Sequence, residues 1–121
     1  MRVDVAKEIS RLNFEDFLWC VFIILSFLNI LGDYDDKEYL RKHCNSYKME
    51  ANHIFTFTLI ITLFIYLYFF VRNLKKYQSV SENKKDLYLV KVFGSLLLIA
   101  GITCLLYFQE NESSFIGSPS I

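Results

Sequence analysis

The sequence predicts an all-α fold, an integral membrane bundle of three transmembrane helices with short amphipathic flanking segments. One observation is the run 54–71, IFTFTLIITLFIYLYFFV, which has no charged residue. As an α-helix it would extend about 27 Å, close to the thickness of the hydrocarbon core of a bilayer. Another is that charged residues, 21% of the chain, are excluded from three blocks. These observations predict a single membrane domain over residues 1–121, with spans at about 14–32, 54–71 and 87–108.

The first span is expected to begin just after Asn13. Residues 1–13 carry apolar side chains at helical spacing, so we expect them either to lie along the membrane surface or to lead into the helix. Asn13 precedes two carboxylates and has the side chain of an N-cap. The uncharged run 17–31 is short for a full span, so we expect the capped turn and Gly32 to extend it. No small-x-small cleavage site follows this span, and we expect it to be retained.

Residues 32–53, GDYDDKEYLRKHCNSYKMEANH, form the first polar connection. Apolar side chains within it fall on one helical face, which predicts a short amphipathic helix. Its acidic cluster, residues 33–38, has the carboxylates that calcium prefers, but the glycine and glutamate positions of an EF-hand loop are Glu38 and Cys44 here. We therefore expect a solvated helix start, and whether the cluster binds a cation stays open. Zinc is not expected, because only three histidine and cysteine candidates lie on this side.

The second span carries a mildly polar stripe. Thr58, Thr62 and Tyr66 recur at every fourth residue. Asn29, in the outer part of the first span, needs a hydrogen-bond partner in a membrane, and a threonine of the second span is the expected one.

The third span follows the basic connection RNLKKYQSVSENKKD and has the most specific packing signal. Gly94, Gly101 and Cys104 recur at i, i+7 and i+10, so small residues gather on one face and let another helix approach closely. The approaching helix is either the second span or one from another copy of the protein. The candidate helix-packing residues are Asn29, Thr58, Thr62, Gly94, Gly101 and Cys104.

Basic residues predict the orientation. The N-terminal segment has three and the second connection has five, with Lys91 close by, against four in the first connection and none in the tail. This bias predicts a multi-pass protein of the cell membrane with the N-terminus inside and the C-terminus outside.

No chemistry of an enzyme is visible in the sequence. It has no Ser–His–Asp or Cys–His arrangement, no phosphate loop and no metal-hydrolase spacing, so we expect no catalytic residue, no cofactor and no bound metal. Its 13 basic and 13 acidic residues balance, which argues against nucleic acid as a partner. The expected partners are the lipid bilayer and either a second copy or another membrane protein.

The last two spans carry a resemblance. The run IYLYFFVRNLKKYQ, followed by LVKVFGSLLLIAGITCLLYFQ and SSFIGSPSI, resembles a group of small uncharacterised three-span membrane proteins of low-GC Gram-positive bacteria. The resemblance implies a membrane location and a three-span architecture, and it implies no activity.

Three functions follow as hypotheses. The first is a non-enzymatic accessory or interaction subunit that acts through helix contacts. The second is a membrane immunity or defence factor against a pore-forming peptide, and the third is a holin-like pore former, which the tail without basic residues disfavours. A bacteriocin gene beside this one would favour the second, and a lysin gene the third.

Overall fold

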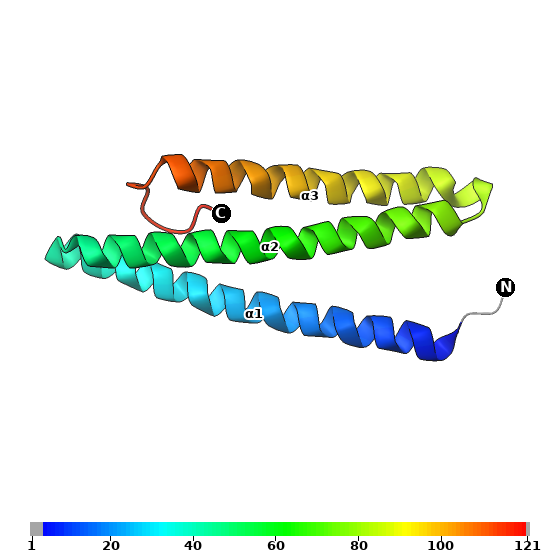
Figure 1. Ribbon diagram of the computed structural model, residues 1–121, viewed down its shortest axis with the longest axis horizontal. Helices are drawn as coiled ribbons and strands as arrows, with labels where there is room; N and C mark the ends of the chain where they lie inside the picture. The colour runs from blue at the N-terminus through cyan, green and yellow to red at the C-terminus, as the bar shows by residue number, and fades with distance from the viewer. Residues whose placement is uncertain (1–3, 121) are drawn as a thin grey trace.

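The computed structural model describes residues 4–120, and they form three long α-helices in an antiparallel row. Helix α1 spans Val5–Lys42, α2 spans Asn45–Ser79, and α3 spans Lys85–Asn111, preceded by the short 3-10 helix η1 at Glu82–Lys84. Helix α2 lies in the middle and packs against both neighbours (Figure 1). No Cα atom of α1 comes within 8 Å of one of α3 in the described part of the chain. The all-α three-helix prediction is confirmed.

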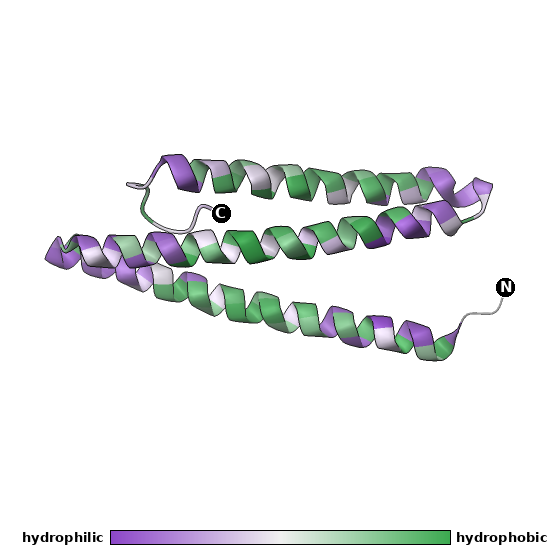
Figure 2. Ribbon diagram, in the orientation of Figure 1, coloured by the Kyte–Doolittle hydropathy of each residue, from purple (hydrophilic) through white to green (hydrophobic). Residues whose placement is uncertain are grey.

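Each long helix contains a segment that is long and apolar enough to cross a membrane. Polar residues gather at the two ends of the helices, and apolar residues fill the middle (Figure 2). Many large apolar side chains in that middle are exposed, among them Phe27, Phe64 and Leu97. An aqueous surface with so much continuous apolar area would be unusual, so the exterior suits lipid and marks a multi-pass membrane protein.

The helices extend well beyond the expected spans. The prediction that Asn13 caps the first helix is wrong, because α1 already begins at Val5 and Asp4 is its N-cap. The Asp4 carboxylate accepts a hydrogen bond from the backbone N–H of Lys7 at 3.2 Å. An asparagine before two acids is a local signal, and the apolar spacing upstream lets the helix start earlier.

The first polar connection is also different from the expected one. A separate short helix does not form, because α1 continues to Lys42 and α2 starts at Asn45. The turn consists of His43 and Cys44, and His43 has the left-handed backbone conformation, φ 54°, that often ends a helix. Its N–H donates to the Tyr39 carbonyl at 2.7 Å. This short turn makes α1 and α2 a long helical hairpin.

Gly32 lets α1 and α2 approach closely near the hairpin turn. A Cβ atom at Gly32 would lie 2.5 Å from Cε1 and 2.7 Å from Cζ of Phe55, far inside van der Waals contact. The ring of Phe55 is 1% exposed, so it has no free space into which it can move. The sequence analysis gave Gly32 only the task of lengthening the first span, and this contact was missed.

We predict that Gly32→Ala destabilises the protein by about 1–3 kcal/mol, although alanine is the better helix former by about 1 kcal/mol. The reason is the overlap of the new methyl group with the Phe55 ring. Thermal unfolding in detergent measures the effect. Gly94→Ala is the control, because nothing lies within 4 Å of a Cβ atom there. Adding Phe55→Leu should recover part of the loss; a Gly32→Ala variant as stable as Gly94→Ala would contradict the contact.

Candidate functional site

The groove between α1 and α3 is the candidate site. Its walls are α1 and α3 and its floor is α2, because each of the two outer helices packs against α2 and no Cα atom of one lies within 8 Å of a Cα atom of the other. Near the middle of the helices it forms a cleft of about 330 Å³. Leu25 comes from the first wall, Leu98 and Gly101 come from the other, and Thr58 and Thr62 come from the floor. The structure therefore brings several of the sequence-selected residues to one place.

Polar groups lie in the floor of this apolar groove. Asn29 of α1 lies beside Thr58 of α2, with 3.0 Å between Asn29 Oδ1 and the Thr58 hydroxyl, and Thr58 is 4% exposed. The same hydroxyl lies 2.9 Å from the Phe55 carbonyl, but it has one proton to donate. If the Asn29 amide nitrogen faces Thr58 instead of its oxygen, the amide donates to the hydroxyl and the hydroxyl donates to Phe55. The Thr58 hydroxyl then both accepts and donates one hydrogen bond.

Thr62 has a different role from Thr58. Its hydroxyl donates to the Thr58 carbonyl at 2.8 Å, so its hydrogen-bond donor is paired within α2. Thr62 therefore adds polarity to the groove without joining two helices. Closer to the other end, Asn73 of α2 donates to the hydroxyl of Ser95 on α3, an interhelical contact that was not among the sequence-selected candidates.

Gly94 and Gly101 of α3 do not pack against other helices among the described residues of this chain. Nothing lies within 4 Å of a Cβ atom built at Gly94 or Gly101, and Cys104 is exposed. The sequence left two helices that could approach these glycines, the second span or a helix of another copy. The second span does not pack against either glycine. Gly101 instead lines the α3 wall of the groove. The face formed by Gly94, Gly101 and Cys104 is called the small face of α3 below.

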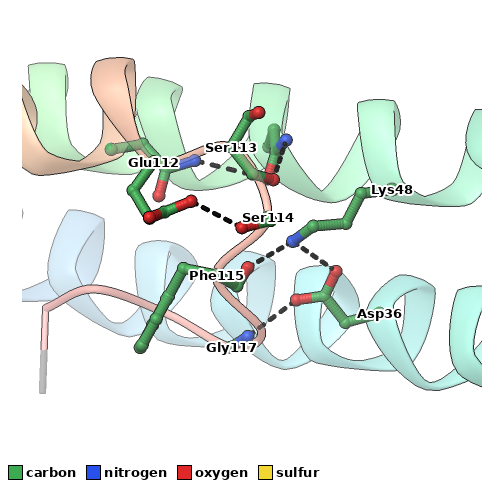
Figure 3. Close-up of polar contacts among 9 residues, drawn as sticks. Asp36, Lys48, Glu112, Ser113, Ser114, Phe115 and Gly117 are labelled. Carbon is green, nitrogen blue, oxygen red and sulfur yellow. Dashed lines mark hydrogen bonds and ion pairs between the residues drawn. The ribbon is translucent and has the colours of Figure 1, made fainter.

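The C-terminal tail, residues 112–120, closes one end of the groove. It turns back after α3 and lies against the α1–α2 hairpin (Figure 1). Lys48 of α2 forms an ion pair with Asp36 of α1 at 3.1 Å and also donates to the Phe115 carbonyl. The other Asp36 carboxylate oxygen accepts from the backbone N–H of Gly117 at 2.7 Å (Figure 3). One buried ion pair thus joins α1, α2 and the tail.

Further contacts hold the same tail. Asn52 of α2 donates to the Ser113 carbonyl at 3.1 Å, and Gln109 of α3 lies 3.4 Å from the Asn52 side-chain oxygen. Gly117 has φ +96°, a left-handed conformation that glycine adopts readily and other residues rarely do. After this turn, Pro119 is buried and Ser120 lines the groove.

The acidic cluster of residues 33–38 is not the solvated helix start that the sequence predicted. It lies inside α1, and three of its four carboxylates are buried: Asp35, Asp36 and Glu38. The hairpin turn and the tail cover this end of the helices, which no local pattern in the cluster indicates. Among residues 4–120 no group of three or more histidine, cysteine, aspartate and glutamate side chains is arranged to hold a metal ion.

The buried carboxylates have different environments. Burial raises the pKa of Asp35, and the nearby Glu50 and Asp36 carboxylates raise it further. Hydrogen bonds from Lys42 and Arg41 lower the pKa of Glu38, whose oxygens lie 3.0 Å and 2.8 Å from those two side chains. Asp35 Oδ2 is buried without a hydrogen-bond partner among the described residues. Asp35 is therefore the carboxylate of this end that the fold destabilises when it is charged.

Sequence reasoning missed the buried pair of Asp36 and Lys48. Their separation of 12 residues gives no local spacing signal, because the contact depends on the hairpin turn between them. A turn signal at His43 and Cys44 would have been needed to find it, and neither residue type marks a turn strongly.

Comparison with protein-family models, with curated proteins and with solved structures finds no match to this chain. The resemblance of the last two spans to small three-span membrane proteins therefore stays a prediction.

We predict that Asp35→Asn raises the unfolding midpoint at neutral pH, because it removes a buried charge. Folding raises the pKa of Asp35, so the folded protein gains stability through this group as the pH falls through the raised pKa towards its ordinary value of 3.8. The advantage of the variant should accordingly shrink over that range. Thermal unfolding in detergent at a series of pH values measures it.

Asp86→Asn is the control for this prediction, since Asp86 is exposed in the first turn of α3. Its effect on the midpoint at neutral pH should be small. A variant of Asp35 that is less stable than the parent protein at neutral pH would show that the charged carboxylate is favourable where it lies.

Proposed function

We propose that this chain is a small integral protein of the cell membrane that acts as a non-enzymatic accessory or interaction subunit through helix contacts. The observation that carries the proposal is the open groove: α1 and α3 each pack only on α2, and small and polar residues line the space between them. In lipid there is no hydrophobic drive between helices, so close packing and polar contacts drive association. The small face of α3 allows close packing, and the groove offers polar contacts.

The partner that we propose is a second copy of this chain. Gly94 and Gly101 are seven residues apart, a spacing that keeps them on one seam of a left-handed helix pair. A twofold axis beside α3 would bring the same small residues of two copies together, because such an interface uses one surface patch twice. Cys104, exposed on the same face, would then lie near the Cys104 of the partner subunit.

We predict that Cys104 forms an intermolecular disulfide in membranes treated with a mild oxidant. The test uses the Cys20→Ser, Cys44→Ser background and measures the dimer on a non-reducing gel. Gly101→Leu should reduce the dimer severalfold, because the added side chain separates the helices. It should leave the unfolding midpoint of the single chain nearly unchanged, since nothing lies within 4 Å of a Cβ atom at Gly101.

Thr103→Leu is the matched control, because Thr103 is exposed and lies two residues along, away from the small face. This variant should retain the dimer. If both variants lose the dimer equally, or if the parent background forms no dimer, the two copies do not meet at this face.

The orientation that we propose has the N-terminus inside, and it is supported by the basic residues of the N-terminal segment and the second connection. It predicts that Cys44, exposed at the hairpin turn, reacts with an impermeant maleimide in intact cells. A hydrogen bond with Ser46 lowers the pKa of the Cys44 thiol, which favours the reactive thiolate. Labelling is measured in the Cys20→Ser, Cys104→Ser background.

The inside reporter is Ser81→Cys on a background without other cysteines, since Ser81 is exposed in the second connection. It should react only after the cells are permeabilised. Reaction of Ser81→Cys in intact cells, with Cys44 protected, would reverse the orientation.

A further inference from the structure

A cluster of basic side chains lies at the end of the groove opposite the tail. There, the three helices enclose a cleft of about 230 Å³. Arg11 comes from α1, Arg72 and Lys76 come from α2, and Lys91 comes from α3. These four residues are spread over 81 positions of the sequence, and the fold gathers them in one place. We call this cleft the basic pocket.

The carboxylates at the basic pocket neutralise only part of its charge. Glu8 lines the pocket and pairs with Arg11 at 3.0 Å, and Glu15 lies 3.6 Å from the same arginine. Lys76 and Lys91 are exposed, and no carboxylate of the described residues lies within 4.0 Å of either. The pocket therefore keeps a net positive charge and two lysines whose ammonium groups face no acid.

Arg72 is the least satisfied group in the basic pocket. Its side chain is 22% exposed, and the nearest carboxylate oxygen, from Glu15, is 3.8 Å from Nη1. That distance is too long for a hydrogen bond. Nη1 is buried and has no hydrogen-bond partner among residues 4–120. A buried guanidinium N–H without an acceptor is costly, so Arg72, whose side chain lines the pocket, gains if a small shift turns this group towards an anionic oxygen there.

The basic pocket lies near one edge of the apolar segments of the helices. Arg72 directly follows the uncharged run 54–71, and Lys91 lies in the first turn of the expected span 87–108. The four cations therefore lie where the hydrocarbon segments of the helices end. No Cα atom of α1 lies within 8 Å of one of α3, and the pocket lies between these two helices and α2.

We propose that the basic pocket binds the phosphate group of an anionic phospholipid. A guanidinium fork matches phosphate oxygens in geometry, and lysines add charge at the rim. Basic pockets between transmembrane helices are known sites for anionic headgroups. Arg72 is the central ligand, and Lys76 and Lys91 select a headgroup that carries net negative charge. This site does not depend on association through the small face of α3, which lies along the apolar part of that helix.

The experiment measures lipid retention by the full chain in detergent. Phosphatidylglycerol and phosphatidylcholine with identical acyl chains are titrated separately, and intact-complex mass spectrometry gives the fraction of protein that carries one lipid. We expect a preference for phosphatidylglycerol. The double variant Lys76→Gln, Lys91→Gln should weaken its binding on the order of tenfold or more. Both lysines are exposed and unpaired, so the fold should survive, and the unfolding midpoint checks this.

The matched control is the double variant Lys75→Gln, Lys84→Gln. It removes the same charge from the same end of the molecule, but neither residue lines the basic pocket. Retained binding in the control and lost binding in the pocket variant supports the proposal. If both double variants lose phosphatidylglycerol binding equally, the lipid is attracted to a basic surface in general and the proposal of a specific pocket is wrong.

A second arm separates the two sources of phosphate. Inorganic phosphate is added to the phosphatidylglycerol complex, with chloride at matched ionic strength as its reference. Phosphatidylglycerol that stays bound supports a lipid site. If phosphate displaces phosphatidylglycerol and chloride does not, Arg72 binds a phosphate group but the natural ligand is not a lipid. If the first arm shows no preference for phosphatidylglycerol over phosphatidylcholine, both the lipid assignment and the phosphate site are wrong.

Discussion

The ion pair between Lys48 and Asp36 is the interaction on which one whole end of the molecule depends. Its two side chains are 10% and 2% exposed, and they join α1, α2 and the tail. A buried pair contributes little net stability over an apolar pair, yet removal of one partner leaves an uncompensated charge at a cost of about 3–5 kcal/mol. The position of the tail, and with it the closed end of the groove, follows from this pair.

The two ends of the groove consequently have opposite character. At the hairpin end, the buried pair of Asp36 and Lys48 joins α1 to α2, and the tail lies against both side chains. At the other end, four basic residues line a cleft that the C-terminal tail does not reach. Between them lies a mostly apolar cleft, where Asn29 of α1 contacts Thr58 of α2. The molecule is polarised along its helices, although its formal net charge is zero.

The glycines show how the same residue type serves different purposes in one bundle. Gly32 is buried under the Phe55 ring, and the contact of α1 with α2 requires its lack of a side chain. Gly94 and Gly101 have open space before them, so their presence lowers helix propensity without any gain inside the chain. A glycine that lowers the stability of a helix and makes no close contact within one copy suggests a contact with another molecule. This contrast, and not the glycine pattern alone, supports association through the small face of α3.

Much of the architecture was predictable from the sequence. Uncharged runs of sufficient length must be helical in lipid, because every backbone N–H and C=O has to be paired within the segment. The three helices follow from that requirement, and their antiparallel order follows from the short connections, whereas the place of α2 between the other two is visible only in the structure. The threonine stripe of α2 was also visible, because helical spacing is a local property.

Only the tertiary structure decided which surfaces meet. The start of α1 at Val5 and the two-residue turn at His43 and Cys44 were not predicted, since cap and turn signals are weak and local. The turn then sets the register of α1 against α2, which buries Asp36 beside Lys48 and places Phe55 over Gly32. The basic pocket likewise depends on three helices far apart in the chain. A single sequence carries the periodicity of each helix, but it does not state how far one helix is rotated or shifted against the next, and that register decides every one of these contacts.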